Sequence, residues 1–283
     1  MGWQFWKRNT DDPLAKLFFK NYRLNLLSIP REKVSLCDVY MGDADGHQKL
    51  LSSPGSIKNF LEPPFEIPSA GMVTDDQMTD IYDTASNAIS ANVALDFLEG
   101  LLNTLAGIPF GTNIRGSYEQ KGTSLIKLRF DSATEDRIDR YLLGDKLRGH
   151  KISNGNTAII PGRNYYIVIA VARSNSISIN AKGENQKDVD IKAEASSIAS
   201  GSVSFSQDTS RKSELKFKGD KKLAFGVELS ELIYDTQYQQ LRLDPMTESF
   251  RVRGKKDTIR TRKVIKSSFI GDPKEGDMFV DLL

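Results

Sequence analysis

Much of the second half of the chain alternates hydrophobic and polar residues with a period of two, which is typical of β-strands with one buried face. The alternation runs through residues 126–130, 177–181, 189–195, 203–205, 215–217 and 223–229. Several of these segments are mild, with alanine or serine where larger side chains could stand. The pattern predicts a half-buried antiparallel sheet.

One apolar stretch is continuous instead of alternating. Residues 165–172 (YYIVIAVA) are eight apolar residues in a row, which predicts a strand buried on both faces. The run is far shorter than the roughly 20 residues that a transmembrane helix needs. Residues 1–8 also lack the apolar stretch of a signal peptide. We therefore expect a soluble chain whose membrane activity, if present, comes from amphipathic segments or a conformational change.

Two other segments show helical spacing. Residues 14–29 predict a short basic amphipathic helix that passes into a strand ended by Pro30. Residues 74–106 predict a longer helix, with Thr74 as its N-cap and an apolar face that broadens toward its end. Helices combined with antiparallel strands predict the α+β class.

Composition and charge exclude several classes of function. The net charge is +2 and the basic residues form no single stripe, so we expect no nucleic-acid partner. The one cysteine, Cys37, lies in a strand predicted over 34–41; it excludes an internal disulfide and fits a reducing cytoplasm. Neither His47 nor His150 has a histidine or cysteine at metal-ligand spacing. Because no nucleophile elbow or phosphate loop is present, we expect no enzyme, no catalytic or metal site and no cofactor.

A basic segment separates the body of the chain from its last twenty residues. Residues 251–263 contain seven basic residues and one acidic residue, which is typical of a solvated linker and of a site that proteases cut. The expected cleavage region comprises Arg251, Arg253, Lys255, Lys256, Arg260, Arg262 and Lys263.

The segment 264–283 is apolar in places and acidic in net charge. Its large apolar residues would be a liability in water, so we expect them to dock on the body. They are Phe269, Ile270, Met278, Phe279, Val280, Leu282 and Leu283. The predicted organisation is therefore a body over 1–250, a linker over 251–263 and a docked tail over 264–283.

Four blocks of sequence, in order, resemble one known family. They are NLLSIPR at 25–31, YLLG at 141–144, NYYIVIAVARS at 164–174, and KLAFGVEL at 222–229 followed by Tyr234 and Asp235. These blocks are similar to motifs of the bacterial gasdermins and span about residues 22–240. The resemblance implies a twisted central antiparallel sheet with peripheral helices, kept inactive by the short C-terminal tail.

The resemblance also implies a function. In this family a protease removes a short C-terminal peptide, and the remainder oligomerises into membrane pores that kill the cell, commonly as a defence against phage. Residues 74–130 and 174–218 would then contain the segments that refold into membrane-spanning hairpins. The expected membrane-inserting residues are Ile126, Leu128, Phe130, Ile177, Ile179, Val189, Ile191, Ala193, Ala195, Val203 and Phe205.

The expected partners follow from this scheme. The precursor would be a cytoplasmic monomer, and the cleaved chain would join a large homo-oligomeric ring in the lipids of the inner membrane. An activating protease is a further partner. Some relatives carry an acylated cysteine near the N-terminus, where this chain has Trp3 and Gln4. The residues alone leave two alternatives: a soluble β-rich scaffold or adaptor without membrane activity, and, after it, an enzyme.

Overall fold

The main feature of the structure is one large antiparallel sheet built on two long strands. The computed structural model describes residues 18–19, 21–42, 50–78, 89–90, 123–153, 164–183, 214–235, 240–243, 245–251 and 259–265. Within these residues the strands form a 10-stranded sheet and two separate two-stranded sheets.

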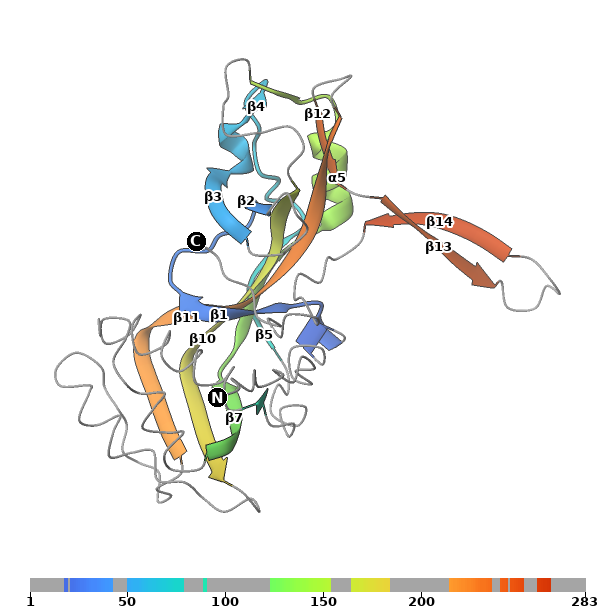
Figure 1. Cartoon of the computed structure of the whole chain (residues 1–283). Coiled ribbons are helices and arrows are strands. Elements are labelled where there is room, and N and C mark those ends of the chain that lie inside the picture. The colour runs from blue at the N-terminus through green and yellow to red at the C-terminus, as the bar shows by residue number, and fades with distance from the viewer. Residues whose placement is uncertain are drawn as a thin grey trace, which may run out of the picture.

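Strands β10 (Tyr165–Gly183) and β11 (Glu214–Asp235) are the centre of the sheet. They pair antiparallel from Tyr165 opposite Leu232 to Asn180 opposite Glu214. Figure 1 shows both strands running through the length of the sheet. Each strand joins two segments that the sequence pattern identified separately.

The other strands attach to this pair. Along β10 lie in turn β2 (Asp38–Gly42), β8 (Thr134–Ile138) and β7 (Thr123–Asp131). Along β11 lie β1 (Asn25–Arg31) and β12 (Gln240–Leu243). The outer neighbours are β3 (Leu50–Ser56) on β2, β5 (Met72–Gln77) on β8 and β6 (Ile89–Ser90) on β7.

The apolar run at 165–172 is buried on both faces, as predicted. One face packs against the helix α5 (Arg140–Leu147), the 3₁₀ turn η1 (Ile57–Asn59) and the small β4–β9 sheet (Leu61–Glu62 and Lys151–Ile152). Tyr165, Ile167 and Ile169 belong to this core, whereas Tyr166 and Val168 belong to the opposite one with Leu27, Val34 and Tyr40. The register shifts between Val168 and Ala170, and Val171 consequently joins the second core.

Helix α5 covers one end of the sheet and begins at an acidic N-cap. Asp139 accepts hydrogen bonds from the backbone N–H groups of Tyr141 and Leu142 at 2.9 and 2.8 Å. Leu143 and Leu147 point into the core beneath it. A mostly antiparallel sheet with a peripheral helix confirms the predicted fold class.

The helix predicted over 74–106 is wrong at residues 74–77 and 89–90, which form strands. Thr74 is not an N-cap, because residues 72–77 form β5 and pair with β8, with Val73 opposite Arg137 and Asp76 opposite Glu135. Asp75 takes a left-handed conformation with φ of 59°, where the register shifts. Residues 89–90 pair with β7 as strand β6. Pairing with a strand distant in sequence therefore overrides the local helical spacing; the rest of the predicted helix lies outside the described residues.

Two boundaries near the start of the chain also differ from the prediction. Strand β1 continues through Pro30 and ends at Arg31. Its register on β11 shifts between Leu26 and Arg31, so Pro30 lies in the irregular part of the strand. Cys37 is not in a strand: it sits in a turn with φ of 65°, and β2 begins at the next residue.

The predicted amphipathic helix before β1 is present as helical residues at 18–19 and 21–22. It delivers Phe18 into an aromatic cluster with two strands of the sheet. Phe130 of β7 stacks on Phe225 of β11 with ring centroids 3.9 Å apart, and Phe18 meets both rings edge-on at 6.0 and 6.3 Å. All three side chains are buried, so this cluster holds the helical residues at 18–19 and 21–22 against the sheet.

The basic segment predicted as a linker has strands at both ends. β13 (Pro245–Arg251) and β14 (Ile259–Ile265) pair antiparallel, with Glu248 opposite Arg262 and Phe250 opposite Arg260. The alternation of Ile259 and Thr261 with arginines favours a strand, and the density of charge concealed it in the sequence. Figure 1 shows this hairpin reaching away from the large sheet.

The hairpin divides the residues of the predicted cleavage region and tail. Arg251 ends β13, while Arg260, Arg262 and Lys263 belong to β14. Val264 and Ile265, the first residues of the predicted tail, also belong to β14. Arg253, Lys255 and Lys256, and the tail from residue 266 onward with all its large apolar residues, lie outside the description.

The aromatic cluster gives a prediction about stability. Phe225→Ala should lower the free energy of unfolding by about 3–5 kcal/mol, because it removes a fully buried ring and leaves a cavity between two others. Urea denaturation followed by circular dichroism measures the change. Val73→Ala, at a side chain that is 49% exposed, is the control and should stay within about 0.5 kcal/mol of the parent. An equal, small effect of both substitutions would contradict the packing described.

Candidate functional site

The large sheet changes partners at one level, and this level is the candidate functional site. Strand β10 pairs with β8 up to Arg173, opposite Thr134, and with β7 from Ser176, opposite Asp131. The chain turns between the two neighbours at Ser132, whose φ is 50°. We call the sheet on the β8 side the body, the segments 123–131, 176–183 and 214–218 the limb, and the level between them the joint.

Strand β11 is irregular at the same level. Ser174 pairs with Leu223 and Ser176 with Lys218, so four residues of β11 (219–222) stand opposite the single residue Asn175. A bulge of this kind bends a strand and increases its local twist. Both neighbours of β10 are therefore interrupted at the joint, while β10 itself continues through it.

The limb brings several of the predicted membrane-inserting residues together. The register places Phe130 opposite Ile177, Leu128 opposite Ile179 and Ile126 opposite Ala181. Residues opposite each other in antiparallel strands share one face. Phe130 and Ile177 are only 1% and 2% exposed, so this face is covered at the root of the limb. The remaining residues of the set, Val189, Ile191, Ala193, Ala195, Val203 and Phe205, lie outside the residues that the structure describes.

A buried polar cluster closes the limb side of the joint. Ser174 Oγ lies 2.7 Å from the backbone oxygen of Asp131 and accepts the N–H of Ser176 at 3.0 Å. Ser176 Oγ donates to the Asp131 carboxylate at 3.2 Å. Lys216 Nζ and Arg129 Nε lie 2.8 and 2.9 Å from the same carboxylate. Asp131, Ser174 and Ser176 are all buried, so the cluster links β7, β10 and β11 out of contact with most solvent.

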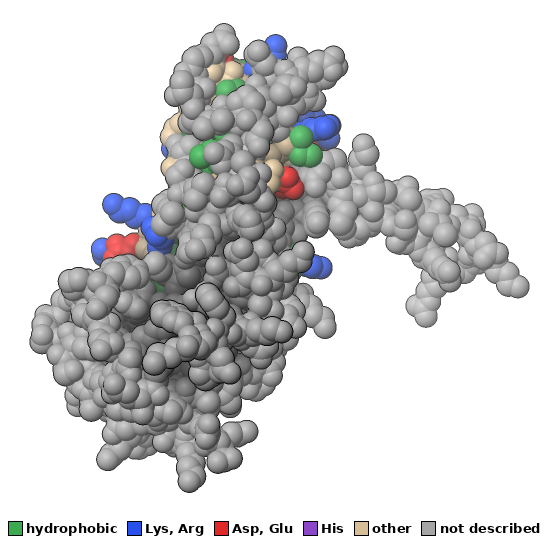
Figure 2. All heavy atoms as spheres, viewed as in Figure 1, with side chains coloured by type: hydrophobic (Ala, Val, Ile, Leu, Met, Phe, Trp, Pro, Cys, Tyr) green, Lys and Arg blue, Asp and Glu red, His purple; other side chains and the backbone are tan. Residues whose placement is uncertain are grey.

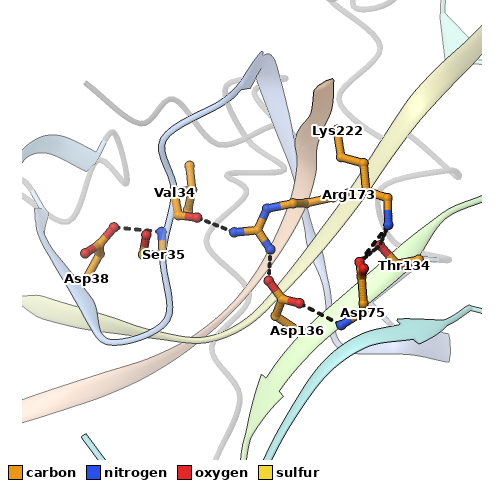
Figure 3. A network of polar contacts seen from close by, with 8 residues as sticks. All are labelled: Val34, Ser35, Asp38, Asp75, Thr134, Asp136, Arg173 and Lys222. Carbon is orange, nitrogen blue, oxygen red and sulfur yellow. Dashed lines mark hydrogen bonds and ion pairs between the residues drawn. The ribbon is translucent and has the colours of Figure 1, made fainter. Parts of the chain in front are cut away.

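A second polar network closes the body side of the joint (Figure 3). Arg173 of β10 forms an ion pair with Asp136 of β8 and donates to the backbone oxygen of Val34. Asp136 also accepts the backbone N–H of Asp75 at 2.9 Å. These contacts tie the loop before β2 to β10, β8 and β5.

Lys222 connects the β11 bulge to this network. Its Nζ lies 2.6 Å from the Asp75 carboxylate and 3.2 Å from Thr134 Oγ. The hydrogen bond from Lys222, with that from Thr134, lowers the pKa of Asp75 below its ordinary value. The bulge is therefore pinned to the body rather than to the limb.

A buried carboxylate lies deeper in the body. Glu228 of β11 is fully buried and forms ion pairs with Arg137 of β8 and Arg140 at the start of α5, the latter at 3.2 Å. Removing one partner of such a pair leaves an uncompensated charge, which costs far more than the pair contributes. The contact fixes the positions of β8, β11 and α5 relative to one another.

The chemistry of the described surface is otherwise modest. A polar cavity of about 360 Å³ lies beside the helical turn, with Arg23, Asp76, Glu135 and Arg137 among its lining residues. No group of three metal-ligating side chains occurs among the described residues. On the face shown in Figure 2, the hydrophobic side chains of the described residues are exposed only in small, separate areas. Within the same residues, no helix is long and apolar enough to cross a membrane.

The only cysteine is buried in the body. Cys37 has no exposed surface, and burial, with the nearby charge of Asp38, raises its pKa to about 12. Its backbone N–H donates to the carbonyl oxygen of Val168 at 2.8 Å, which holds the turn against the central strand. The Cys37 thiol is therefore closed off from solvent in the folded chain.

The fold is a mostly antiparallel sheet that continues past the joint into the limb. Comparison with known families identifies the family of the chain. The model of the Bacterial Gasdermin Family matches residues 27–240, and the chain belongs to this family. Membership of this family supports a pore-forming protein rather than a catalytic one.

Two relatives agree with this assignment. The chain is 23% identical to a gasdermin, bGSDM, of Vitiosangium sp. (strain GDMCC 1.1324) over 227 residues, which cover 78% of this chain and 81% of the relative. The solved structure of a bacterial gasdermin from Bradyrhizobium tropiciagri superposes with a TM-score of 0.58 and 18% identity, covering 98% of each chain. The structural likeness shows that the fold is shared.

The burial of Cys37 gives a prediction about its reactivity. A thiol with a pKa of about 12 holds little thiolate near neutral pH, and thiolate is the reactive form. We expect a maleimide reagent at pH 7 to modify the folded chain at least about 100-fold more slowly than the chain in urea. Mass spectrometry of quenched samples measures both rates. Comparable rates would contradict the burial, and the Cys37→Ser variant should take up no label.

Proposed function

We propose that this chain is the precursor of a membrane pore. Proteolytic removal of residues 264–283 lets the remainder bind the inner membrane, oligomerise into a large ring and kill the cell, in defence against phage. The observation that carries the proposal is the continuity of β10 and β11 from the body into an amphipathic limb, in a chain of the gasdermin family.

The limb has the properties that an inserting segment needs. Its two central strands need no new connection to the body, because their backbones already cross the joint. Its apolar face is covered at Phe130 and Ile177, which keeps the resting protein free of exposed apolar surface there. An open strand edge in lipid leaves unsatisfied backbone groups, so insertion requires pairing between copies and hence a closed ring.

The hairpin β13–β14 supports the proposed site of cleavage. Within the described residues its strands pair only with each other, and a lone two-stranded hairpin is marginally stable in water. Cutting the chain there leaves the large sheet intact. The proposed target of a protease that cuts after basic residues is the segment 251–263, and a cut after its last residue, Lys263, releases residues 264–283.

Charge favours membrane binding after cleavage. Residues 264–283 carry two basic and four acidic residues, a net charge of −2, so residues 1–263 carry +2 − (−2) = +4. Each basic residue near an anionic membrane surface contributes roughly 1 kcal/mol of attraction. Release of the acidic peptide thus strengthens attraction to the lipids of the inner membrane, and the precursor stays in the cytoplasm until it is cut.

Cleavage and leakage can be tested together. Brief trypsin treatment should cut first within 251–263, as mass spectrometry would show, and only the cut chain should release dye from liposomes of bacterial lipid. A stop codon after Lys263 should make expression toxic. A second truncation after Ile265 retains the whole β13–β14 ladder and separates loss of the tail from loss of the hairpin.

Either of two results would exclude this scheme. One is healthy growth of cells that express the shortened chain in soluble form, which would favour a scaffold without membrane activity. The other is a first cut by trypsin inside 174–218, because the limb would then be more accessible than the hairpin.

The face of the second inserting segment gives a further prediction. By period-two alternation Ala193 shares a face with Val189 and Ile191, and Lys192 lies on the other face. Arginine at the midplane of a bilayer costs an inserted strand roughly 2–4 kcal/mol, and a ring repeats this cost in every copy. Ala193→Arg should therefore abolish dye release while leaving cleavage intact, and Lys192→Ser should be nearly silent. Circular dichroism of the uncut variants controls for folding; equal leakage from Ala193→Arg and the parent would refute the assignment.

A further inference from the structure

The buried cluster at the joint depends on the angle between limb and body. Ser174 binds Asp131 and Ser176 at the same time, so its hydroxyl connects the end of β7 to both sides of Asn175. Hydrogen bonds weaken steeply when donor and acceptor separate by more than a few tenths of an ångström or lose alignment. These contacts can therefore form in one orientation of the joint and not in a substantially different one.

The Asp131 carboxylate is the centre of this cluster. It receives Ser176 Oγ from β10 at 3.2 Å, Lys216 Nζ from β11 at 2.8 Å and Arg129 Nε from its own strand at 2.9 Å. Every strand of the limb root described here thus contacts one buried side chain. Hydrogen bonds to a charged group are the strong ones, so this residue contributes more to the resting angle than either serine.

The two networks at the joint act on opposite sides of it. The contacts of Arg173, Asp136, Asp75 and Lys222 hold the body and the bulge together, and they involve no residue of the limb. The contacts of Asp131 described above are with limb residues and with Ser174. Movement of the limb would leave the first network intact and break the second.

We propose that Asp131 is a positioning residue for pore formation: with Ser174, Ser176 and Lys216 it forms a clasp that holds the limb in its resting orientation and must open before the limb inserts. This inference rests on the proposed pore function. It assigns part of the kinetic barrier to a defined set of contacts around one buried carboxylate, separate from inhibition by the tail. Weakening the clasp should then accelerate insertion of the cleaved chain, whereas weakening the body should not.

The test compares three variants of the full chain after cleavage. Asp131→Asn keeps the shape of the side chain but removes its charge, and dye release should begin about tenfold sooner than for the parent, the change expected for one charge-assisted contact. Ser176→Ala removes a single hydroxyl and should disturb folding less than Asp131→Asn. It should give a smaller change in the same direction. Asp136→Asn is the matched control: it removes the same charge from an ion pair with β10 on the body side, and its rate should equal that of the parent.

A second measurement uses the uncut chain and needs no leakage. Amide hydrogen exchange at 176–183 should be about tenfold faster in Asp131→Asn, with exchange at 165–172 unchanged. Unchanged limb exchange, slower dye release from Asp131→Asn, or equal acceleration by Asp136→Asn would each overturn the clasp. If the cleaved parent releases no dye while limb exchange responds as expected, the clasp stands and the proposed pore function fails.

Discussion

The rest of the structure depends on the antiparallel ladder between β10 and β11. Every other described strand of the large sheet attaches to this pair directly or through one neighbour. Both backbones cross the joint, so two continuous strands connect the body to the limb. The same continuity means that a change in the angle of the limb is transmitted to the body through the backbone itself.

Buried charges fix how the strands meet on this ladder. Glu228 with its two arginines sits in the body, and Asp131 with Lys216 sits at the root of the limb. Such pairs contribute little net stability, but any other register would leave one of these charges buried without its partner. A slip by one residue would also move the apolar side chains of each buried face to the other face, so packing and these ion pairs specify the register together.

Most of the sheet could be predicted from the sequence because its signal is local. Strands are identified locally by the alternation at 126–130, 215–217 and 223–229 and by the apolar run at 165–172. Strand β5 was missed because its pairing with β8 comes from residues about sixty positions away, while its own spacing resembles a helix. The β13–β14 hairpin was missed because its basic charge is typical of a linker.

The joint was missed for a different reason. Asp131, Ser174 and Lys216 come from three separate segments, and only the register places them together. The local pattern pointed the other way: Ser174, Ser176 and Ser178 lie on the polar face of an alternating segment, which normally indicates a solvated face. The structure buries all three, with Ser176 and Ser178 each 5% exposed.

This burial explains the composition of the limb root. Ile177 is covered on one face and the serines are covered on the other, so the resting limb is closed on both sides where it leaves the body. Under the proposed function one face later meets lipid and the other meets water. Serine suits both states, because its small hydroxyl can bond to protein neighbours when buried and to water when exposed, whereas a buried lysine would need a charged partner at each position. The long basic side chains of this region stand instead on the neighbouring strands, with Arg129 on β7 and Lys216 and Lys218 on β11. Each lies opposite Ser178 or Ser176, where a carboxylate or solvent is within reach.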